Sequence, residues 1–425
     1  MNGYCDPRFA KVREVFEQGF TDGSELGAAV AVYLRGEPVV DLWYGTADRH
    51  TGREWAEDTP AYVYSCTKAV TATVLLMLVE RGLVEVGAPV ATYWPEFGKP
   101  EITVEHVLSH QAGLPVLEGV VPVEEFENQA VIAARLAVQT PLWEPGTAHG
   151  YHALTYGFLV GEVVRRVTGK SVGELVAAEI AGPYGLEMWL GAPDEVIGRA
   201  ARLTASVRGT TPGGPAPTTR SAVSGPGDAA VTRPAAATDG PAGAVSVGGG
   251  SAGAAVGGAG EGLVERMARA FADPQSLVNR ALGNPDMQKL PGGANHPVIM
   301  RSGWPAAGMV ATARGLAGFY RALLAGEILA PETLAEAMRR RVQGPDEVLL
   351  VDSSFGLGFM RPSMGFLVPR GGAEGAFGHT GMGGFLGLGD VRHGLAVGYT
   401  PNRMANAASG GLRAYRLLEA VYAAL

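Results

Sequence analysis

The sequence predicts an α/β fold in which both ends of the chain supply strands to one sheet, with a helical part between them. Near the N-terminus, Ala28–Leu34 and Pro38–Tyr44 are rich in β-forming residues, and Gly384–Gly389 and Leu395–Tyr399 are comparable runs near the C-terminus. The stretch between these ends carries mostly helical patterns. With 425 residues, 47% of them hydrophobic and 18% charged, the chain has the composition of a protein with a large core.

The N-terminal part begins with a predicted helix from Pro7 to Gln18, followed by a hairpin whose turn is Arg35–Glu37. The next segment, Ala69 to Leu83, has apolar residues on all faces of a helix. A helix that is apolar all round is buried, so we predict a central core helix that stops near Gly82.

The remaining elements are predicted from shorter patterns. Helices are expected at residues 123–139, 153–168, 172–180, 263–272, 312–325, 331–341 and 411–425, and a further strand at Phe355–Met360.

Residues 206–262 differ in composition from the rest of the chain, because they contain no aromatic residue, no Leu and no Ile. Such a stretch buries too little apolar surface to offset its ordering entropy, so we predict a disordered insertion or a loose surface loop. Without it, the chain forms one predicted domain, with an α/β part at about 1–65 and 290–425 and a helical part at about 66–205. Gly249–Gly253 matches G-x-S-x-G, but it lies in this insertion, without the strand and helix that a nucleophile elbow needs.

Charge and composition exclude several classes of partner. The formal net charge of -8, with no Lys/Arg cluster, argues against nucleic acid as a binding partner. The N-terminus lacks the apolar region of a signal peptide, and no apolar run approaches the ~18 residues of a membrane span. Cys5 and Cys66 are the only cysteines, and His106 and His110 lack the Glu of a zinc motif. We therefore expect a cytoplasmic protein with no membrane partner, no cofactor and no metal.

Ser65 and Lys68 carry the strongest chemical signal. Ser65 stands where the buried helix begins, and Lys68, one of only five lysines, lies one turn further on the same face. Burial favours the neutral form of a lysine, which accepts a proton, and a helix N-terminus stabilises an oxyanion. The alternative is that Ser65 only caps the helix while Lys68 reaches solvent.

Two further segments add candidate residues. Tyr151 stands at a loop-to-helix junction, where it serves as a general base if a lysine lowers its pKa, or simply packs at a helix start. His379 and Thr380 have glycines on both sides, which lets a strand edge approach a ligand, although the segment alone also fits a Gly-rich turn.

Together these segments resemble the three motifs of class C β-lactamases and of the related family VIII carboxylesterases, in order and approximate spacing. The matching segments are Ser65-Cys66-Thr67-Lys68, Tyr151-His152-Ala153, His379-Thr380-Gly381, Tyr93-Trp94-Pro95-Glu96-Phe97, Ile102-Thr103-Val104 and Leu108–Pro115. The resemblance covers nearly the whole chain apart from the insertion. It implies a β-lactamase-like fold, with an antiparallel sheet flanked by helices and an all-helical subdomain.

The resemblance also implies residue roles. Ser65 corresponds to the acylated nucleophile, and Lys68 and Tyr151 to the pair that takes its proton and later activates water. The backbone N–H groups of Ser65 and Met382 correspond to the oxyanion hole. We expect His379, Thr380, Gly381 and Ala153 to line the substrate side of the cleft, and Trp304 either to border the acyl pocket or to pack in the core.

Two positions depart from the β-lactamase pattern, and both favour neutral esters. Ala153 replaces an asparagine, and His379 replaces a lysine whose permanent charge would meet a β-lactam carboxylate. The sequence therefore predicts a serine carboxylesterase acting on small acyl esters. The alternatives are an acyltransferase, a D-amino-acid amidase, a weak β-lactamase, or a non-catalytic binding protein on the same fold. The sequence leaves the oligomeric state open.

Overall fold

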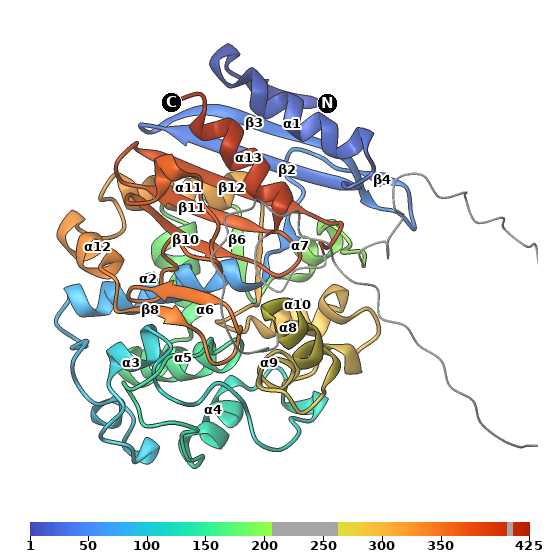
Figure 1. Ribbon diagram of the computed structural model, residues 1–425. Coiled ribbons are helices and arrows are strands. Elements are labelled where there is room, and N and C mark those ends of the chain that lie inside the picture. The colour runs from blue at the N-terminus through green and yellow to red at the C-terminus, as the bar shows by residue number, and fades with distance from the viewer. Residues whose placement is uncertain (206–261, 406–410) are drawn as a thin grey trace, which may run out of the picture. The chain divides into compact units, whose positions relative to one another are not determined.

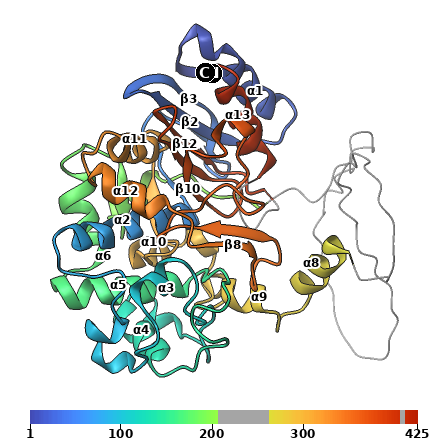
Figure 2. The ribbon, with the colours of Figure 1, turned by 60° about the vertical axis from the view of Figure 1, so that its left-hand side comes forward.

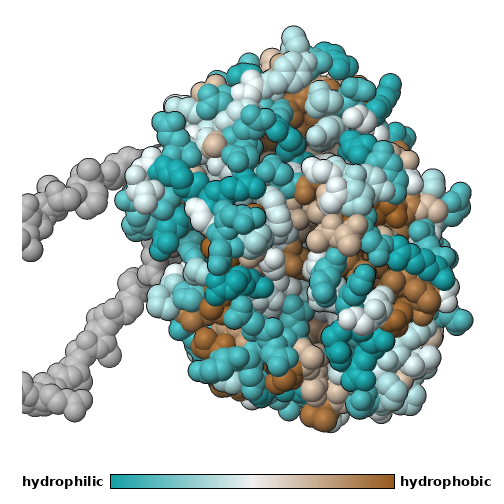
Figure 3. Space-filling model, turned by 180° about the vertical axis from the view of Figure 1, so that it is seen from behind, coloured by the Kyte–Doolittle hydropathy of each residue, from teal (hydrophilic) through white to brown (hydrophobic). Residues whose placement is uncertain are grey.

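The computed structural model describes residues 1–205, 262–405 and 411–425. The predicted insertion, apart from its last residue, lies outside the described residues, as does the Gly249–Gly253 motif. Within the described ranges, no helix combines the length and the apolar character needed to cross a membrane. On the face seen in Figure 3, hydrophobic residues form small groups among hydrophilic ones.

The principal sheet joins the two ends of the chain, as the sequence predicts (Figure 1). Its antiparallel strands follow the order β1-β3-β2-β12-β11-β10, and β4 pairs with β3. At its centre the N-terminal strand β2 pairs with the C-terminal strand β12, with Val30 opposite Tyr399. The strands are β1 (Asn2–Cys5), β2 (Gly27–Leu34), β3 (Glu37–Asp48), β4 (Arg53–Glu54), β10 (Ala376–Thr380), β11 (Leu386–Asp390) and β12 (Leu395–Pro401).

Helices cover both faces of this sheet (Figures 1 and 2). On one face lie α1 (Ala10–Thr21) and α13 (Leu412–Tyr422), and on the other lies α11 (Ala313–Leu324). Gly398 of β12 permits the close approach of α11, because a Cβ atom there would lie 2.2 Å from the carbonyl oxygen of Ala313.

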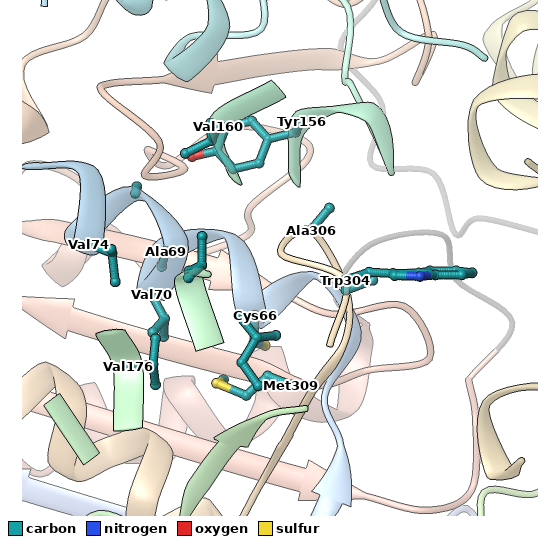
Figure 4. Packing of buried hydrophobic residues seen from close by; sticks show 14 of the residues in the cluster. Cys66, Ala69, Val70, Val74, Tyr156, Val160, Val176, Trp304, Ala306 and Met309 are labelled. Atoms are coloured by element: carbon teal, nitrogen blue, oxygen red, sulfur yellow. The ribbon is translucent and has the colours of Figure 1, made fainter. Parts of the chain in front are cut away.

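The predicted core helix is confirmed as α2 (Thr67–Glu80), in which every residue from Thr67 to Leu78 is buried. Figure 4 shows α2 between Tyr156 and Val160 on one side and Val176 on the other. This burial all round matches the absence of a polar stripe in its sequence.

The other helices surround α2 or follow it in the chain. They are α3 (Val104–Leu108), α4 (Gln129–Ala137), α5 (Thr155–Thr168), α6 (Val172–Leu175), α7 (Asp194–Arg199), α8 (Leu263–Ala272), α9 (Leu277–Leu282), α10 (Pro297–Ser302) and α12 (Pro331–Met338). Two small sheets complete the fold, one of β5 (Ala61–Tyr62), β7 (Met309–Ala311) and β6 (Met188–Leu190), the other of β8 (Val342–Pro345) and β9 (Asp352–Phe355).

Three predicted elements differ from the structure. The helix at 123–139 is divided into the 3₁₀ turn η5 (Val123–Glu125) and α4, because the Asn128 side chain caps α4 by accepting from Val131 N–H. The helix at 172–180 continues past α6 as the π-helical turn η6 (Val176–Ala181).

The third difference concerns the strand predicted at Phe355–Met360, which is wrong. Strand β9 ends at Phe355, and the chain then bends at Gly358, whose φ is +79°. A Cβ atom on Gly358 would lie 2.2 Å from the Cβ atom of Ala72, so the close packing of this bend against α2 requires a glycine.

Candidate active site

Ser65 lies in the 3₁₀ turn η2 (Tyr64–Cys66), which leads directly into α2. Tyr64 adopts φ +47°, an uncommon conformation for a residue with a side chain. The Thr67 hydroxyl donates to the Tyr64 carbonyl at 2.5 Å and accepts from the Met309 N–H at 3.1 Å. The turn that presents Ser65 is thus tied to β7.

Lys68 is fully buried at the start of α2, and its Nζ has three oxygen neighbours. It lies 3.1 Å from Ser65 Oγ, 2.7 Å from the Ala153 carbonyl oxygen and 2.9 Å from the Ala306 carbonyl oxygen. Burial lowers the pKa of Lys68 well below its ordinary value of 10.5. None of the three neighbours is a carboxylate that would stabilise an ammonium ion.

The oxygen atoms around Nζ fit a neutral amine, the form that a lowered pKa favours. Carbonyl oxygens only accept, so the oxygens of Ala153 and Ala306 use the two N–H groups of a neutral amine. The lone pair then faces Ser65 Oγ and can accept the hydroxyl proton. The pair therefore has the arrangement that a serine nucleophile and its base would need, with the two atoms in hydrogen-bond range.

Tyr151 completes the cluster. Its side chain is buried and hydrogen-bonds with the side chain of Ser65, and Lys68 Nζ lies 4.8 Å from the centre of its ring. Burial raises the pKa of Tyr151 well above its ordinary value of 10, and the bond to Ser65 only partly opposes this effect. The phenol keeps its proton at neutral pH, so Tyr151 is suited to pass a proton between Ser65, Lys68 and a leaving group.

Asp346 anchors the backbone of Tyr151 from a distant part of the chain. Its buried carboxylate accepts from Tyr151 N–H at 3.0 Å and from the Ser353 hydroxyl at 2.8 Å. It also accepts from the N–H groups of Val348 and Leu349, at 2.9 and 2.8 Å. Nothing in the sequence around Asp346 marks a functional residue, so sequence patterns do not identify it.

Aromatic and imidazole rings surround Tyr151. The Phe355 ring stacks on it at 6.1 Å between centroids, and the His110 ring lies 5.1 Å away. His110 Nδ1 accepts from His152 N–H at 3.1 Å, and His152 Nε2 accepts from Leu114 N–H at 3.0 Å. Burial lowers the pKa of His110 well below 6.5 and that of His152 to about 4, so both rings are neutral supports.

The third motif lies beside Ser65. His379 and Thr380 end strand β10, and the His379 carbonyl accepts from Cys66 Sγ at 3.3 Å. The next residue, Gly381, is so close to the segment before Ser65 that a Cβ atom would lie 2.4 Å from the Val63 carbonyl oxygen. A glycine is required for this approach.

The His379 ring is buried and neutral. Its Nδ1 lies 2.7 Å from the Thr380 carbonyl oxygen, which only accepts, so Nδ1 carries the hydrogen. Burial lowers the pKa of His379 to about 3. Its Nε2 has no hydrogen-bond partner among the described residues. The position that resembles a β-lactamase lysine therefore holds no cation here.

Residues 381–384 form a tight turn that orients Met382. Gly384 N–H donates to the Gly381 carbonyl at 3.3 Å, and Gly381 N–H donates to the Phe385 carbonyl at 2.9 Å. A trans peptide is planar, so the Met382 N–H points away from the Gly381 carbonyl that Gly384 binds. The turn is suited to present this N–H to an oxyanion.

The structure places two other predicted site residues, Ala153 and Trp304, away from the role expected for their side chains. The carbonyl of Ala153, rather than its methyl group, contacts Lys68. Trp304 is only 1% exposed, and its indole N–H donates to the Phe126 carbonyl at 2.7 Å (Figure 4). The structure therefore places Trp304 in the core, two residues before the Ala306 carbonyl that binds Lys68. Backbone oxygens leave no signature in a sequence, so the contacts of the Ala153 and Ala306 carbonyls with Lys68 could not be predicted.

In the part of the chain that the structure describes, no three His, Cys, Asp or Glu side chains gather in a way that would hold a metal ion.

Comparisons with known proteins show the family of this chain. A family model described as beta-lactamase matches residues 12–422. The esterase/beta-lactamase LipL of Mycobacterium tuberculosis is 34% identical over 417 residues, which are 95% of this chain and 83% of that protein. The crystal structure of a family VIII carboxylesterase is similar with a TM-score of 0.79 and 32% identity. A penicillin-binding protein homolog from Caulobacter crescentus is similar with a TM-score of 0.77 and 34% identity. Each of these two structural comparisons covers 100% of this chain and 99% of the other.

Proposed function

Because the chain belongs to the β-lactamase family, we propose that it is a serine carboxylesterase that hydrolyses short-chain acyl esters through an acyl-enzyme on Ser65. The esterases among its relatives identify it as a serine hydrolase. The single observation that carries the proposal is the position of Lys68 Nζ, buried between two carbonyl oxygens and 3.1 Å from Ser65 Oγ.

The acylation step uses the side chains of Ser65, Lys68 and Tyr151 in turn. Ser65 Oγ attacks the ester carbonyl carbon while its proton passes to Lys68 Nζ. The tetrahedral oxyanion is held by the backbone N–H groups of Ser65 and Met382. As the carbon–oxygen bond to the alcohol breaks, a proton reaches the leaving oxygen through the Tyr151 hydroxyl, and the alcohol departs.

Deacylation repeats these steps with water as the nucleophile. Water gives a proton to the Lys68–Tyr151 pair, its oxygen attacks the acyl carbon, and Ser65 Oγ leaves and takes the proton back. The products are a carboxylic acid and the original enzyme.

The substrate class follows from the charge of the site. The neutral ring of His379 offers no cation to a substrate carboxylate, and Ala153 lacks an amide that would bind a polar acyl side chain. Both features favour an uncharged ester over a β-lactam or a peptide stem.

A pre-steady-state experiment with a short-chain p-nitrophenyl ester tests the proposal. We expect a burst of nitrophenol from the native protein and none from Ser65→Ala or Lys68→Ala, with both variants folded. Lys170→Ala, which removes an exposed lysine, is the matched control and should keep the burst. A native burst that persists in Ser65→Ala would contradict the assignment of the nucleophile.

The same assay separates the remaining alternatives. The similar structure titled as a penicillin-binding protein homolog makes amide and β-lactam substrates worth testing in parallel. Faster turnover of a D-amino-acid amide or a chromogenic cephalosporin than of the ester would replace the esterase proposal. Product that appears mainly as a new ester when an alcohol is added would indicate an acyltransferase. No turnover, and no labelling of Ser65 by a phosphonate, would indicate a binding protein.

A further inference from the structure

Arg413 reaches from the first turn of α13 to the turn that carries Met382. Its Nη2 donates to the Gly383 carbonyl at 3.2 Å and to the Arg403 carbonyl, and its Nη1 donates to the Ser24 carbonyl at 2.7 Å. One guanidinium group thus connects the chain before β2, the chain after β12 and residues 381–384.

A buried carboxylate holds Arg413 in this position. Glu25 Oε2 accepts from Arg413 Nη1 at 2.7 Å, and Glu25 Oε1 accepts from the hydroxyl of Tyr399 on β12. The side chains of Arg413 and Glu25 are only 15% and 4% exposed. An ion pair this well buried, with its remaining hydrogen bonds satisfied, gives a fixed geometry.

A second hydrogen bond joins the turn at 381–384 to the chain after β12, two residues beyond Arg403. The Gly383 carbonyl also accepts from Ala405 N–H at 2.8 Å. Gly383 has φ +83°, and a Cβ atom there would lie 2.3 Å from Met404 Cε. Gly383 directly follows Met382, so both attachments act one residue from the proposed oxyanion donor.

We propose that Arg413 is a positioning residue that, held by Glu25, fixes the turn at 381–384 so that the Met382 N–H meets the oxyanion. This inference rests on the proposed function, since it assigns a role in the same acyl transfer. An arginine is required because its planar fork spans Glu25 and the two carbonyls of Gly383 and Arg403, whereas a lysine concentrates its donors on one atom.

Arg413→Lys tests the inference while keeping the charge beside Glu25. A misplaced oxyanion donor weakens the transition state more than the bound substrate. We therefore expect kcat for the p-nitrophenyl ester to fall about 10-fold, with KM changed by less than about twofold. Affinity for a boronic acid, which forms a tetrahedral anion on a serine, should fall in parallel with kcat/KM. Arg416→Lys, on the exposed side of the same helix, is the matched control and should keep native kinetics.

Thermal unfolding of each variant separates positioning from folding. If Arg413→Lys does not fold, Glu25→Gln takes its place, because glutamine keeps an acceptor for Arg413 but not the charge that holds it. We expect a smaller fall in kcat for this variant, again without a matching change in KM.

The outcomes distinguish the inference from the proposed function. Native protein that neither hydrolyses the ester nor reacts with a phosphonate overturns the proposed function and the inference with it. Reactive native protein, with folded Arg413→Lys that matches it in kcat and in boronic acid affinity, overturns the inference alone. A parallel loss in Arg416→Lys also overturns it, because the effect would then belong to α13 as a whole.

Discussion

Lys68 is buried and Arg413 is largely buried, yet the surroundings of these two basic side chains differ. Arg413 pairs with the Glu25 carboxylate, whereas the neighbours of Lys68 are a hydroxyl and two carbonyl oxygens. An arginine stays protonated when buried, so its pairing with a carboxylate fixes its position rather than its charge. A buried lysine without a carboxylate has a lowered pKa, which favours the form that can accept a proton. The comparison indicates that residue type and pairing, together with burial, separate the proposed base from the structural group.

The largest expected effect comes from replacing Lys68 with arginine, which always carries a positive charge. Arginine stays protonated at any working pH, so Lys68→Arg cannot accept the Ser65 proton. We expect kcat for the ester to fall by about 10³-fold to 10⁴-fold, the usual contribution of a positioned base. Steady-state kinetics measure this, and circular dichroism confirms the fold. Activity within tenfold of native would mean that Lys68 acts as a cation rather than a base.

A smaller effect is expected at Tyr151. Tyr151→Phe removes the hydroxyl that bonds to Ser65 but keeps the ring that stacks on Phe355. We expect kcat to fall about 10²-fold, with the melting temperature nearly unchanged. A leaving group that needs no protonation, such as p-nitrophenol, should lose less rate than an alkyl alcohol. Equal losses for both esters would contradict the role in proton transfer.

Asp346→Asn tests whether a carboxylate that binds only the backbone of Tyr151 positions its side chain. The amide cannot accept at both of its atoms, so at least one of the four bonds to Asp346 is lost. We expect the free energy of unfolding to fall by about 1–3 kcal/mol and kcat by about 10-fold. Asp352→Asn, at a nearby exposed carboxylate, is the control for chemical denaturation and kinetics. Native kinetics in destabilised Asp346→Asn would limit Asp346 to folding.

The smallest expected effect concerns how the stability of the fold depends on pH at Lys68. The unfolded chain holds a proton on Lys68 up to about pH 10.5, whereas burial in the folded chain lowers the pKa well below that value. Folding therefore releases a proton, and the penalty at Lys68 shrinks as pH rises toward 10.5. We expect Lys68→Met to unfold at a higher temperature than native protein at pH 7, with the gap closing toward pH 10. A constant gap would contradict the neutral state.

The sequence predicted that residues 65, 68, 151 and 379 belong to one site, and the structure brings these residues together. Ser65 and Lys68 are one helical turn apart, which local structure alone supplies, whereas positions 151 and 379–382 were joined to them by the resemblance to a known family. Patterns failed where contacts override local preference. The predicted strand at Phe355–Met360 breaks because Gly358 packs on Ala72, and Asp346 is 195 residues from Tyr151 in the chain.

The sequence by itself determined which groups are present: a serine and a lysine one turn apart, an all-apolar helix behind them, and a histidine in place of a lysine at 379. Only the tertiary structure decided their protonation states. Burial lowers the pKa of Lys68, whose neighbours are carbonyl oxygens from positions 153 and 306 and no carboxylate, whereas Arg413 is fixed in place because folding brings Glu25 to it. Desolvation and pairing depend on what surrounds a group in space, and distant parts of the chain supply those surroundings.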